Sequence, residues 1–358
     1  MKKILKQVLG IDVAKDELVV SLGRKLDNLD DELYCFDAFP NTKKGINDLE
    51  KWALKNTTAE IPIHFIMEAT GVYHERLAYF LDEQGYKVSI VMPAKIAYYR
   101  KTLESKTKTD MACSKVITQF GLSIQVGLWH RPNAVYKSLR QLTRERDQLV
   151  EQCTMTKNML HAEKSEAEPS SEAMTRMLER IALLTKQKKA VEKEIKAVTK
   201  NDPDANEKMK LITSIPGFAT TSASIILAET NGFELIVNRR QLASYAGFDV
   251  TRKDSGTSIK GKPKMSKKGN KFLRKAIYLP SLSGKKFMPE MTEVYKRIVD
   301  KTGIKMKGLA AVQRRMLELA YTLCENKTMY VKDYKQKLEK ERKEAMEIVR
   351  QKKVEVAP

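Results

Sequence analysis

Short apolar runs separated by polar turns dominate the first 130 residues of the chain. Runs of strand length predict β-strands over residues 8–13, 17–22, 33–39, 61–67 and 87–91. Apolar residues at helical spacing predict helices over residues 42–54, 73–84, 93–103 and 110–120. The resulting order is three strands, helix, strand, helix, strand and two helices. This order is typical of a layered α/β domain with a mixed sheet.

A heptad pattern replaces these short runs between residues 133 and 200, a segment that contains no glycine. The apolar positions alternate three and four apart, with one lysine among them: Met174, Met177, Ile181, Leu184, Lys188, Val191, Ile195 and Val198. Leucines at 139, 142, 149 and 160 form a weaker first arm, and residues 161–173 separate the two arms. The pattern predicts a helical hairpin or a long coiled coil. The alternative is an ordinary amphipathic helix pair packed on the domain body.

Helical patterns continue in the last third of the chain. After an expected linker at residues 201–204, helices are predicted over 211–248 with a turn at Ile215–Phe218. That turn resembles hairpins that bind the DNA backbone through main-chain amides. The alternative is an ordinary turn, because Pro-Gly is common between helices. A further helix is expected over residues 305–323. Residues 334–353 read as a charged helix or arm, whose charges form a solvated face.

The charge balance is strongly basic, with 66 Lys and Arg against 45 Asp and Glu and a net charge of +21. Such an excess favours a polyanionic partner, most often nucleic acid. The alternatives are a basic chromosomal or ribosomal-type protein without chemistry, or a protein that binds an anionic membrane surface. No apolar run reaches the roughly 20 residues that span a bilayer, and the N-terminus lacks the apolar stretch of a signal peptide. A cytoplasmic protein with no membrane partner is expected. The four scattered cysteines argue against a zinc or disulfide framework.

Residues 252–275 combine glycines, hydroxyls and many cations, and Asp254 is their only acid. Glycine lets a backbone approach a ligand closely, and Lys and Arg neutralise phosphates. The expected nucleic-acid contacts are Arg252, Lys253, Lys260, Lys262, Lys264, Lys267, Lys268, Lys271 and Arg274; a solvated surface loop is the alternative. A serine here could be a phosphate ligand or a nucleophile. Ser255 is modestly preferred over Ser258 and Ser266 because Gly256 frees the backbone beside it.

Three acids in the first domain form a second candidate site. Asp12 lies within an apolar strand, where a charge is costly unless it is paired or binds metal. Glu68 ends another apolar strand, and Asp110 opens a helix. Their alternative roles are a strand-end salt bridge, a turn acid and a helix cap. Carboxylates that converge without His or Cys suit hard cations such as Mg²⁺, and Mg²⁺ on a basic protein implies phosphodiester chemistry.

The motifs that carry these residues also resemble a known family. Gly10–Lys15, Met67–Tyr73 and Lys108–Asp110 are similar to the amino-terminal domain of the insertion-sequence-110 class of bacterial transposases. The resemblance continues through the carboxy-terminal transposase domain of the same class, in Ser214-Ile215-Pro216-Gly217, Arg240–Gly247, Ser255-Gly256, Ser266–Asn270 and Leu273-Arg274. The two matches lie in the expected order, with a helical region between them.

This resemblance implies both an architecture and a reaction. It implies a RuvC-like, ribonuclease-H-like α/β domain over residues 1–130, a helical coiled-coil region over 131–203 and a mostly helical transposase domain over 204–330. The charged tail is expected over 331–358. Family members use acids of the first domain with Mg²⁺ and a serine of the second, which maps to Ser255, to attack a DNA phosphodiester and form a phosphoserine intermediate.

The partners that the resemblance implies are double-stranded donor and target DNA and a structured noncoding RNA, encoded by the element, that guides the choice of DNA. It also implies a homo-oligomer assembled through the helical region, as a dimer and as a tetramer on DNA. A bacterial, nucleoid-associated location in the cytoplasm follows from such a role.

One position departs from the family pattern Thr-Asp-x-x-Asp-Ala. The chain has Cys113 where the second Asp belongs, and Ser114 in place of the alanine. A thiol is a poor ligand for Mg²⁺. Three carboxylates can still hold one ion with waters. Two rival interpretations stay open at this point: a non-catalytic or attenuated nucleic-acid-binding relative, and a metal-dependent junction nuclease that acts through the first domain alone.

Overall fold

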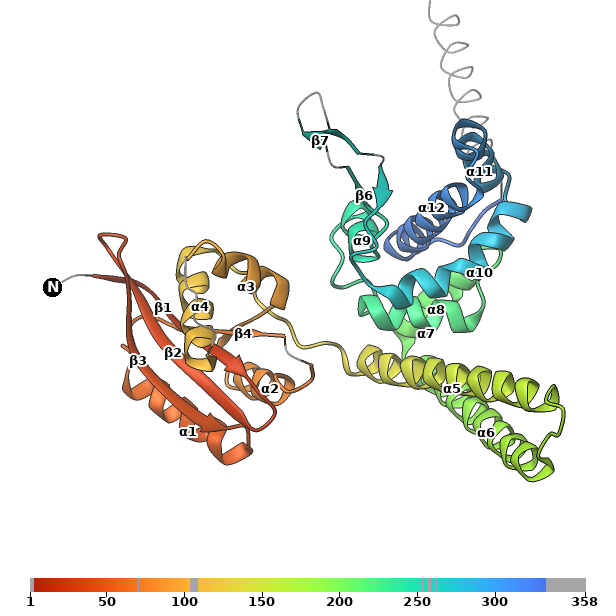
Figure 1. Cartoon of the computed structure of the whole chain (residues 1–358). Coiled ribbons are helices and arrows are strands. Elements are labelled where there is room, and N and C mark those ends of the chain that lie inside the picture. Colours follow the sequence, from red (N-terminus) through yellow and green to blue (C-terminus); the bar gives the residue numbers. More distant parts are fainter. Residues whose placement is uncertain are drawn as a thin grey trace, which may run out of the picture. The chain divides into compact units, whose positions relative to one another are not determined.

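The computed structural model describes residues 3–69, 71–103, 109–252, 254–255, 259–261 and 263–332, with the backbone alone at 254–255 and 259–260. The chain forms two compact units, Met1–Arg131 and Pro132–Pro358, which are coloured from red to yellow and from yellow to blue in Figure 1. Among the described residues, no helix is both long and apolar enough to cross a membrane.

A five-stranded mixed sheet forms the centre of the first unit, in the order β3-β2-β1-β4-β5. Its strands are β1 (Ile4–Val13), β2 (Glu17–Leu26), β3 (Asp31–Pro40), β4 (Ile63–Glu68) and β5 (Lys87–Val91). The first three pair antiparallel, whereas β4 pairs parallel with both β1 and β5. The five strands and the mixed sheet predicted from the apolar runs are therefore confirmed, with β1 to β3 a few residues longer than expected.

Helices cover both faces of this sheet. They are α1 (Lys43–Lys55), α2 (Glu75–Glu83), α3 (Pro93–Arg100) and α4 (Asp110–Ser123). Apolar residues of α1 and α2 pack in one core with Leu9 and Ile11 of β1, and those of α3 and α4 pack in another with Val8. The alternation of a strand thus assigns even-numbered positions of β1 to the face that carries α3 and α4.

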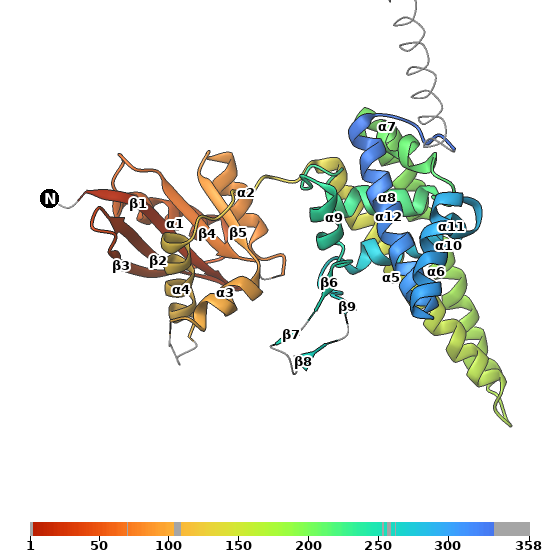
Figure 2. The same ribbon diagram turned by 90° about the horizontal axis from the view of Figure 1, so that it is seen from above.

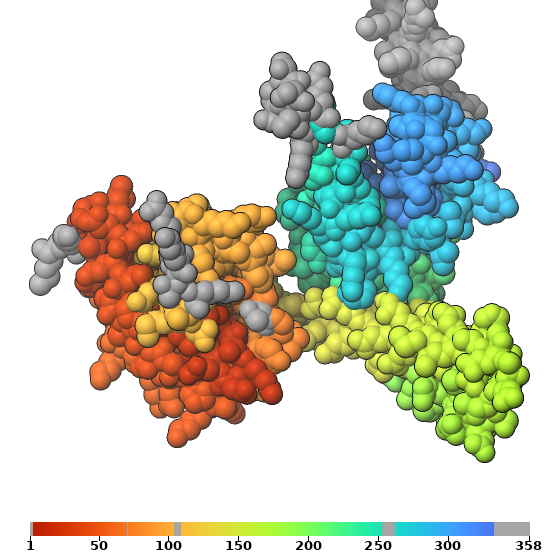
Figure 3. Space-filling view, viewed as in Figure 1, coloured from red at the N-terminus to blue at the C-terminus, as the bar shows by residue number. Residues whose placement is uncertain are grey.

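The second unit begins with a helical hairpin, α5 (Ala134–Lys164) and α6 (Ser171–Asn201), which extends as a lobe from the other helices (Figure 3). All eight predicted heptad positions of α6 are buried or partly buried, Leu184, Val191 and Ile195 most completely. The hairpin is confirmed, and α5 also follows a heptad, because Leu142, Leu149 and Thr156 are seven residues apart and none is exposed. The turn between the helices covers only residues 165–170.

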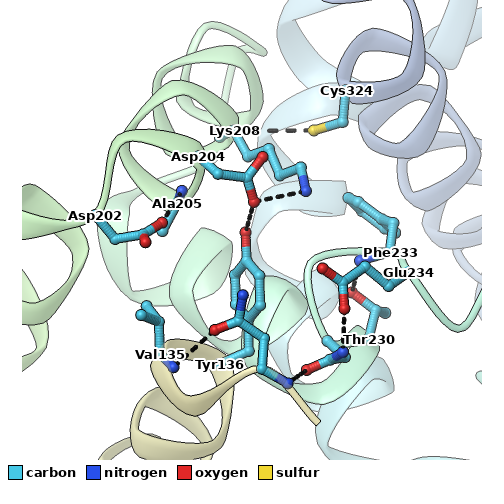
Figure 4. Close-up of polar contacts among 12 residues, drawn as sticks. Val135, Tyr136, Asp202, Asp204, Ala205, Lys208, Thr230, Phe233, Glu234 and Cys324 are labelled. Carbon is cyan, nitrogen blue, oxygen red and sulfur yellow. Dashed lines mark hydrogen bonds and ion pairs between the residues drawn. The ribbon is translucent and has the colours of Figure 1, made fainter. Parts of the chain in front are cut away.

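The root of the hairpin is anchored in the helices that follow it (Figure 4). Tyr136 of α5 is only 1 % exposed, and its hydroxyl donates to Asp204 Oδ2 at 2.5 Å. Lys208 Nζ donates to the same oxygen at 2.8 Å. Asp202 caps α7 (Pro203–Thr213) by accepting from the Ala205 amide at 2.7 Å. The expected linker at residues 201–204 is therefore wrong, since the proline opens a helix at once.

A bundle of helices completes the second unit, as Figure 2 shows from above. They are α8 (Thr220–Thr230), α9 (Arg239–Tyr245), α10 (Lys271–Phe287), α11 (Pro289–Thr302) and α12 (Lys305–Asn326). The helices and turn expected over 211–248 and the helix expected over 305–323 are confirmed, whereas α10 and α11 were not predicted. One continuous core joins residues of α5 and α6 to those of α12. The charged segment at 334–353 lies outside the described residues.

Candidate active site and nucleic-acid-binding arm

The carboxyl ends of β1 and β4 bring two of the predicted acids to one edge of the sheet. The strands are parallel and Gly10 pairs with Ile66, so Asp12 and Glu68, each two residues further on, occupy equivalent positions. Ile66 packs in the core beneath α3 and α4. By strand alternation, Asp12 and Glu68 therefore belong to this same face. Both side chains are partly buried.

The start of α4 supplies the third acid at this face. Thr109 caps the helix, its hydroxyl accepting from the Ala112 amide at 3.2 Å, and Asp110 is the first helical residue. Helix α4 reaches the sheet closely because Gly10 has no side chain: an added Cβ would lie 2.4 Å from Thr118 N and Oγ1. The predicted cap role belongs to Thr109, which leaves the Asp110 carboxylate exposed to solvent.

A chain of contacts links Asp12 to a cation that the sequence did not reveal. Arg100 Nη2, at the end of α3, donates to Cys113 Sγ at 2.9 Å. Burial raises the pKa of Asp12, a hydrogen bond from the Cys113 thiol opposes that rise, and the nearby Asp110 charge adds to it. Burial also raises the pKa of Cys113. The thiol therefore stays protonated and bridges the guanidinium to the Asp12 carboxylate. The Nε atom of Arg100 is buried and has no hydrogen-bond partner among the described residues.

The donor set decides how well this edge suits a hard cation. Within the described part of the chain, no three His, Cys, Asp or Glu side chains lie close enough together to hold a metal ion. Asp12, Glu68 and Asp110 thus form no three-ligand group in this structure, and their role stays a prediction. Asp12 and Asp110 are electrostatically coupled, and Mg²⁺ commonly takes one or two protein carboxylates with water and substrate phosphate. The oxygen ligands of Asp12 and Asp110 are therefore of the type and number that suit one Mg²⁺ ion.

In the second unit, the basic Ser-Gly segment forms a two-stranded arm between α9 and α10 (Figures 1 and 2). Strand β6 (Val250–Thr251) pairs with β9 (Lys264–Met265), and β7 (Asp254–Ser255) pairs with β8 (Ile259–Lys260). Ser255 pairs with Ile259, the pair of described residues farthest from the root of the arm. The candidate nucleophile therefore lies on a short strand of this β-ribbon.

The predicted cationic residues differ in their surroundings. Those whose described side chains are exposed are Arg252, Lys264, Lys267, Lys268 and Lys271. Lys253 and Lys262 lie outside the described residues, and the side chain of Lys260 is not described. Arg274 instead hydrogen-bonds to the backbone: its Nη1 donates to the carbonyl of Ala246 at 2.8 Å and to that of Gly269 at 3.2 Å. Phosphate contact by these residues stays a prediction.

At the root of the arm, residues 245–247 lie in close backbone contact with residues 267–270. The Lys267 amide donates to the Gly247 carbonyl at 3.1 Å, and the Asn270 amide donates to the Tyr245 carbonyl at 2.8 Å. Gly247 has φ +74°, and a Cβ on Gly269 would lie 2.6 Å from Gly247 N. Glycine is required at both places, one for its backbone angle and one for the close approach.

A buried carboxylate beneath this root was also missed by sequence reasoning. The Glu229 side chain at the end of α8 is only 1 % exposed. It accepts from Arg144 Nε at 2.8 Å, from Arg144 Nη2 at 3.0 Å and from Asn270 Nδ2 at 2.6 Å. The signal that could have revealed it is the charge at the end of the otherwise apolar run Ile225–Ala228, since an unpaired charge is costly in a core.

The turn at Ser214–Gly217 packs against α10. Gly217 has φ +95°, and an added Cβ would lie 2.9 Å from the Pro280 carbonyl. The Ser214 hydroxyl accepts from the Tyr330 amide at 2.9 Å. These contacts give the turn a structural role in joining α7 and α8 to the bundle, and DNA-backbone binding by its amides stays a prediction.

Comparison with known proteins decides the family. Residues 9–163 match a transposase model of the IS110 type, and residues 209–296 match the model of the transposase IS116/IS110/IS902 family. The two matches together span more than half of the chain. The chain belongs to the IS110 family of transposases. The two matched segments include both the sheet edge with Asp12 and Glu68 and the arm with Ser255, so the transposase carries both candidate sites within its family-matched regions.

Relatives of this transposase include two proteins named for DNA rearrangement. The pilin gene-inverting protein of Moraxella bovis is 25 % identical over 336 residues, 89 % of this chain and 95 % of that protein. Its Moraxella lacunata counterpart is also 25 % identical, with the same coverage of both chains. A 43.6 kDa protein of insertion element IS110 from Streptomyces coelicolor is 26 % identical over 40 % of this chain and 34 % of its own length. The crystal structure of the Aquifex aeolicus member of the Ppx/GppA family aligns with 89 % of this chain and 90 % of its own at 10 % identity. The TM-score of this alignment is 0.22, which is too low to indicate a shared fold.

Proposed function

We propose that this DNA transposase breaks and rejoins DNA through Ser255, assisted by the acidic edge of the first unit. The observation that carries the proposal is the position of Ser255 at the end of a paired ribbon whose described cationic side chains are exposed. Lysines on the same ribbon can neutralise the charge of a phosphodiester that the serine attacks. The family membership supports DNA recombination as the overall activity.

Strand cleavage by Ser255 needs no reactant other than the protein and the DNA. Attack by Ser255 Oγ forms an ester bond to phosphorus and breaks one phosphorus–oxygen bond of the DNA backbone. The serine proton ends on the leaving deoxyribose oxygen, so a DNA hydroxyl is released and the DNA end stays linked to the protein. Attack by a hydroxyl of a second DNA end reverses these changes and joins the new strands.

The acidic edge supplies a cation site in this proposal. Mg²⁺ bound there would neutralise phosphate charge and polarise the phosphoryl oxygens. Asp12 and Asp110 would hold the ion, and Glu68 on the neighbouring strand would complete the edge. Arg100, fixed through Cys113, adds a positive charge beside Asp12 that needs no metal. The order of strands and the placement of acids at strand ends support a RuvC-like fold for this unit.

The proposed partners are donor and target DNA, and a structured RNA encoded by the element. The net charge of +21 supports binding of such polyanions. The names of the Moraxella relatives also support a DNA-rearranging reaction. Co-purification tests the RNA partner: protein expressed with the DNA that flanks its gene should carry one discrete RNA, and mixed host RNA alone would contradict a dedicated guide.

The proposed homo-oligomer would assemble through the hairpin as a dimer, and as a tetramer on DNA. Large apolar side chains are exposed along its outer half: Met155, Met159, Leu178 and Leu183. Two of the methionines also line a cavity of about 330 Å³ between α5 and α6. Exposed apolar surface of this kind is typical of interaction sites. Light scattering of the Met155→Lys/Leu183→Lys variant should show a smaller species than wild type, and an unchanged mass would contradict this interface.

The serine nucleophile is tested with labelled DNA on a denaturing gel. Wild-type protein should produce a band of DNA that stays attached to protein, and Ser255→Ala should abolish that band while DNA binding stays close to wild type. Ser258→Ala, from the same segment, is the matched control and should retain the band. A covalent band from Ser255→Ala would place the nucleophile elsewhere. Cleaved DNA without any covalent band would instead indicate a hydrolytic nuclease.

A further inference from the structure

The base of the serine-bearing arm is tied to the helical hairpin through one buried carboxylate. Glu229 lies at the end of α8, and it receives two hydrogen bonds from Arg144 of α5 and one from Asn270. Asn270 lies five residues after β9, the last strand of the arm, and caps α10, its Oδ1 accepting from the Phe272 amide at 2.9 Å. Three separate segments therefore meet at a side chain that is only 1 % exposed.

Further contacts connect Glu229 and its two partners to Tyr245 and Phe272. The Tyr245 hydroxyl donates to the Glu229 carbonyl at 2.9 Å, and the Tyr245 carbonyl accepts from the Asn270 amide. Tyr245 ends α9, five residues before β6, the first strand of the arm. The guanidinium of Arg144 also lies 4.8 Å from the ring centroid of Phe272. The two segments that connect the arm to the helices, residues 246–249 and 266–269, thus each adjoin a residue bonded to Glu229.

We propose that Arg144, Glu229 and Asn270 form a positioning cluster that fixes the direction in which the arm presents Ser255. This inference rests on the proposed function for its effect on DNA cleavage, although its effect on the arm does not. A buried carboxylate that accepts bonds from a forked guanidinium has a defined geometry. The paired strands of the arm then carry that geometry from the root toward Ser255.

Two conservative substitutions test the cluster without removing other roles. Asn270→Ser keeps an oxygen that caps α10, but it removes the amide that donates to Glu229. Arg144→Lys keeps the positive charge but loses the bidentate fork. Arg146→Lys is the matched control, because Arg146 also pairs through Nε at 2.8 Å, with Glu192, and lies on the same helix. The control makes the same change at an ion pair that joins α5 to α6 by one hydrogen bond, away from the arm.

Two measurements on the full-length protein separate this inference from the function on which it rests. Limited trypsin digestion reports the arm directly, because the cleavable residues Arg252, Lys264, Lys267 and Lys268 lie in it and at its root. Asn270→Ser and Arg144→Lys should be cut there several-fold faster than wild type and Arg146→Lys. The rate of covalent adduct formation should fall about 10- to 100-fold in both variants, as expected when a reacting group moves by about 1 Å, while DNA affinity stays within about two-fold of wild type.

The outcomes are distinct. Faster digestion of the arm together with slower adduct formation supports the cluster, provided that the thermal midpoints of the two variants match that of Arg146→Lys. Equal digestion of all three variants overturns it. If the wild-type protein forms no adduct at all, the serine mechanism fails, and the digestion pattern alone decides whether the cluster holds the arm.

Discussion

The substitution Gly10→Ala tests how closely α4 must approach the sheet to place the acidic edge. Gly10 faces α4, and its added Cβ would lie 2.4 Å from Thr118 N and Oγ1 and 2.8 Å from the Ser114 carbonyl. Real Cβ atoms essentially never come within 3.0 Å of such atoms, so α4 must move outward by at least about 0.6 Å. A rotamer change cannot relieve this contact, because two of the three atoms belong to the backbone.

The magnitude of the effect follows from this geometry. Overpacking of a core costs about 1–3 kcal/mol, and contact with backbone places Gly10→Ala near the upper end, about 3 kcal/mol. That loss lowers the thermal midpoint of a unit of this size by roughly 10 °C. Because α4 also carries Asp110 and Cys113, a displacement approaching 1 Å should lower DNA cleavage by about 10²-fold.

Tryptophan fluorescence measures the stability of this unit selectively. The chain has two tryptophans, Trp52 and Trp129, and both lie in Met1–Arg131. Gly127→Ala is the matched control, because a Cβ there meets nothing within 4 Å, and its melting curve should follow wild type. The reasoning is refuted if Gly10→Ala melts within 1 °C of wild type and cleaves DNA at the wild-type rate.

The remaining predictions concern the same unit. Asp12→Asn and Glu68→Gln should each remove Mg²⁺-dependent cleavage without unfolding the unit, since burial already raises the Asp12 pKa and disfavours its charged form; activity unchanged by both variants or by chelator would contradict the metal site. Cys113→Asp should raise the cleavage rate, because Mg²⁺ prefers oxygen ligands; a lower thermal midpoint with no gain in rate would show that the residue only packs. Burial lowers the pKa of His64 to about 4, so the unfolded state binds more protons between pH 6.5 and 4. The free energy of unfolding should therefore fall by about 3 kcal/mol as the pH drops through that window. His64→Gln should flatten this dependence relative to the exposed His161→Gln, and equal pH profiles would contradict the assignment.

Much of the first unit could be predicted because its signals are local. Each strand and helix has its own apolar period, and the acids stand out at the ends of apolar runs. Arg100 could not be predicted in this way. Its contact with Cys113 depends on how α3 and α4 pack against each other, and nothing in the sequence around it marks that contact.

The second unit shows where local patterns stop being informative. The heptad of α5 is hidden because polar Arg146 and Thr156 occupy seam positions, and Arg146 is satisfied there by Glu192 across the hairpin. The strands of the arm are two residues long, too short for any periodicity. The cluster at Glu229 joins residues 85 and 41 positions away, a pairing that only the packed structure brings together.

The proposed reaction depends on a covalent bond between Ser255 and DNA. The most direct measurement uses protein expressed with the DNA that flanks its gene, followed by nuclease and trypsin digestion and mass spectrometry of the linked peptide. We expect a nucleotide on the tryptic peptide Asp254–Lys260, with fragmentation placing it on Ser255 and not on Thr257 or Ser258. A nucleotide on any other residue, or cleaved DNA with no linked peptide, would contradict it.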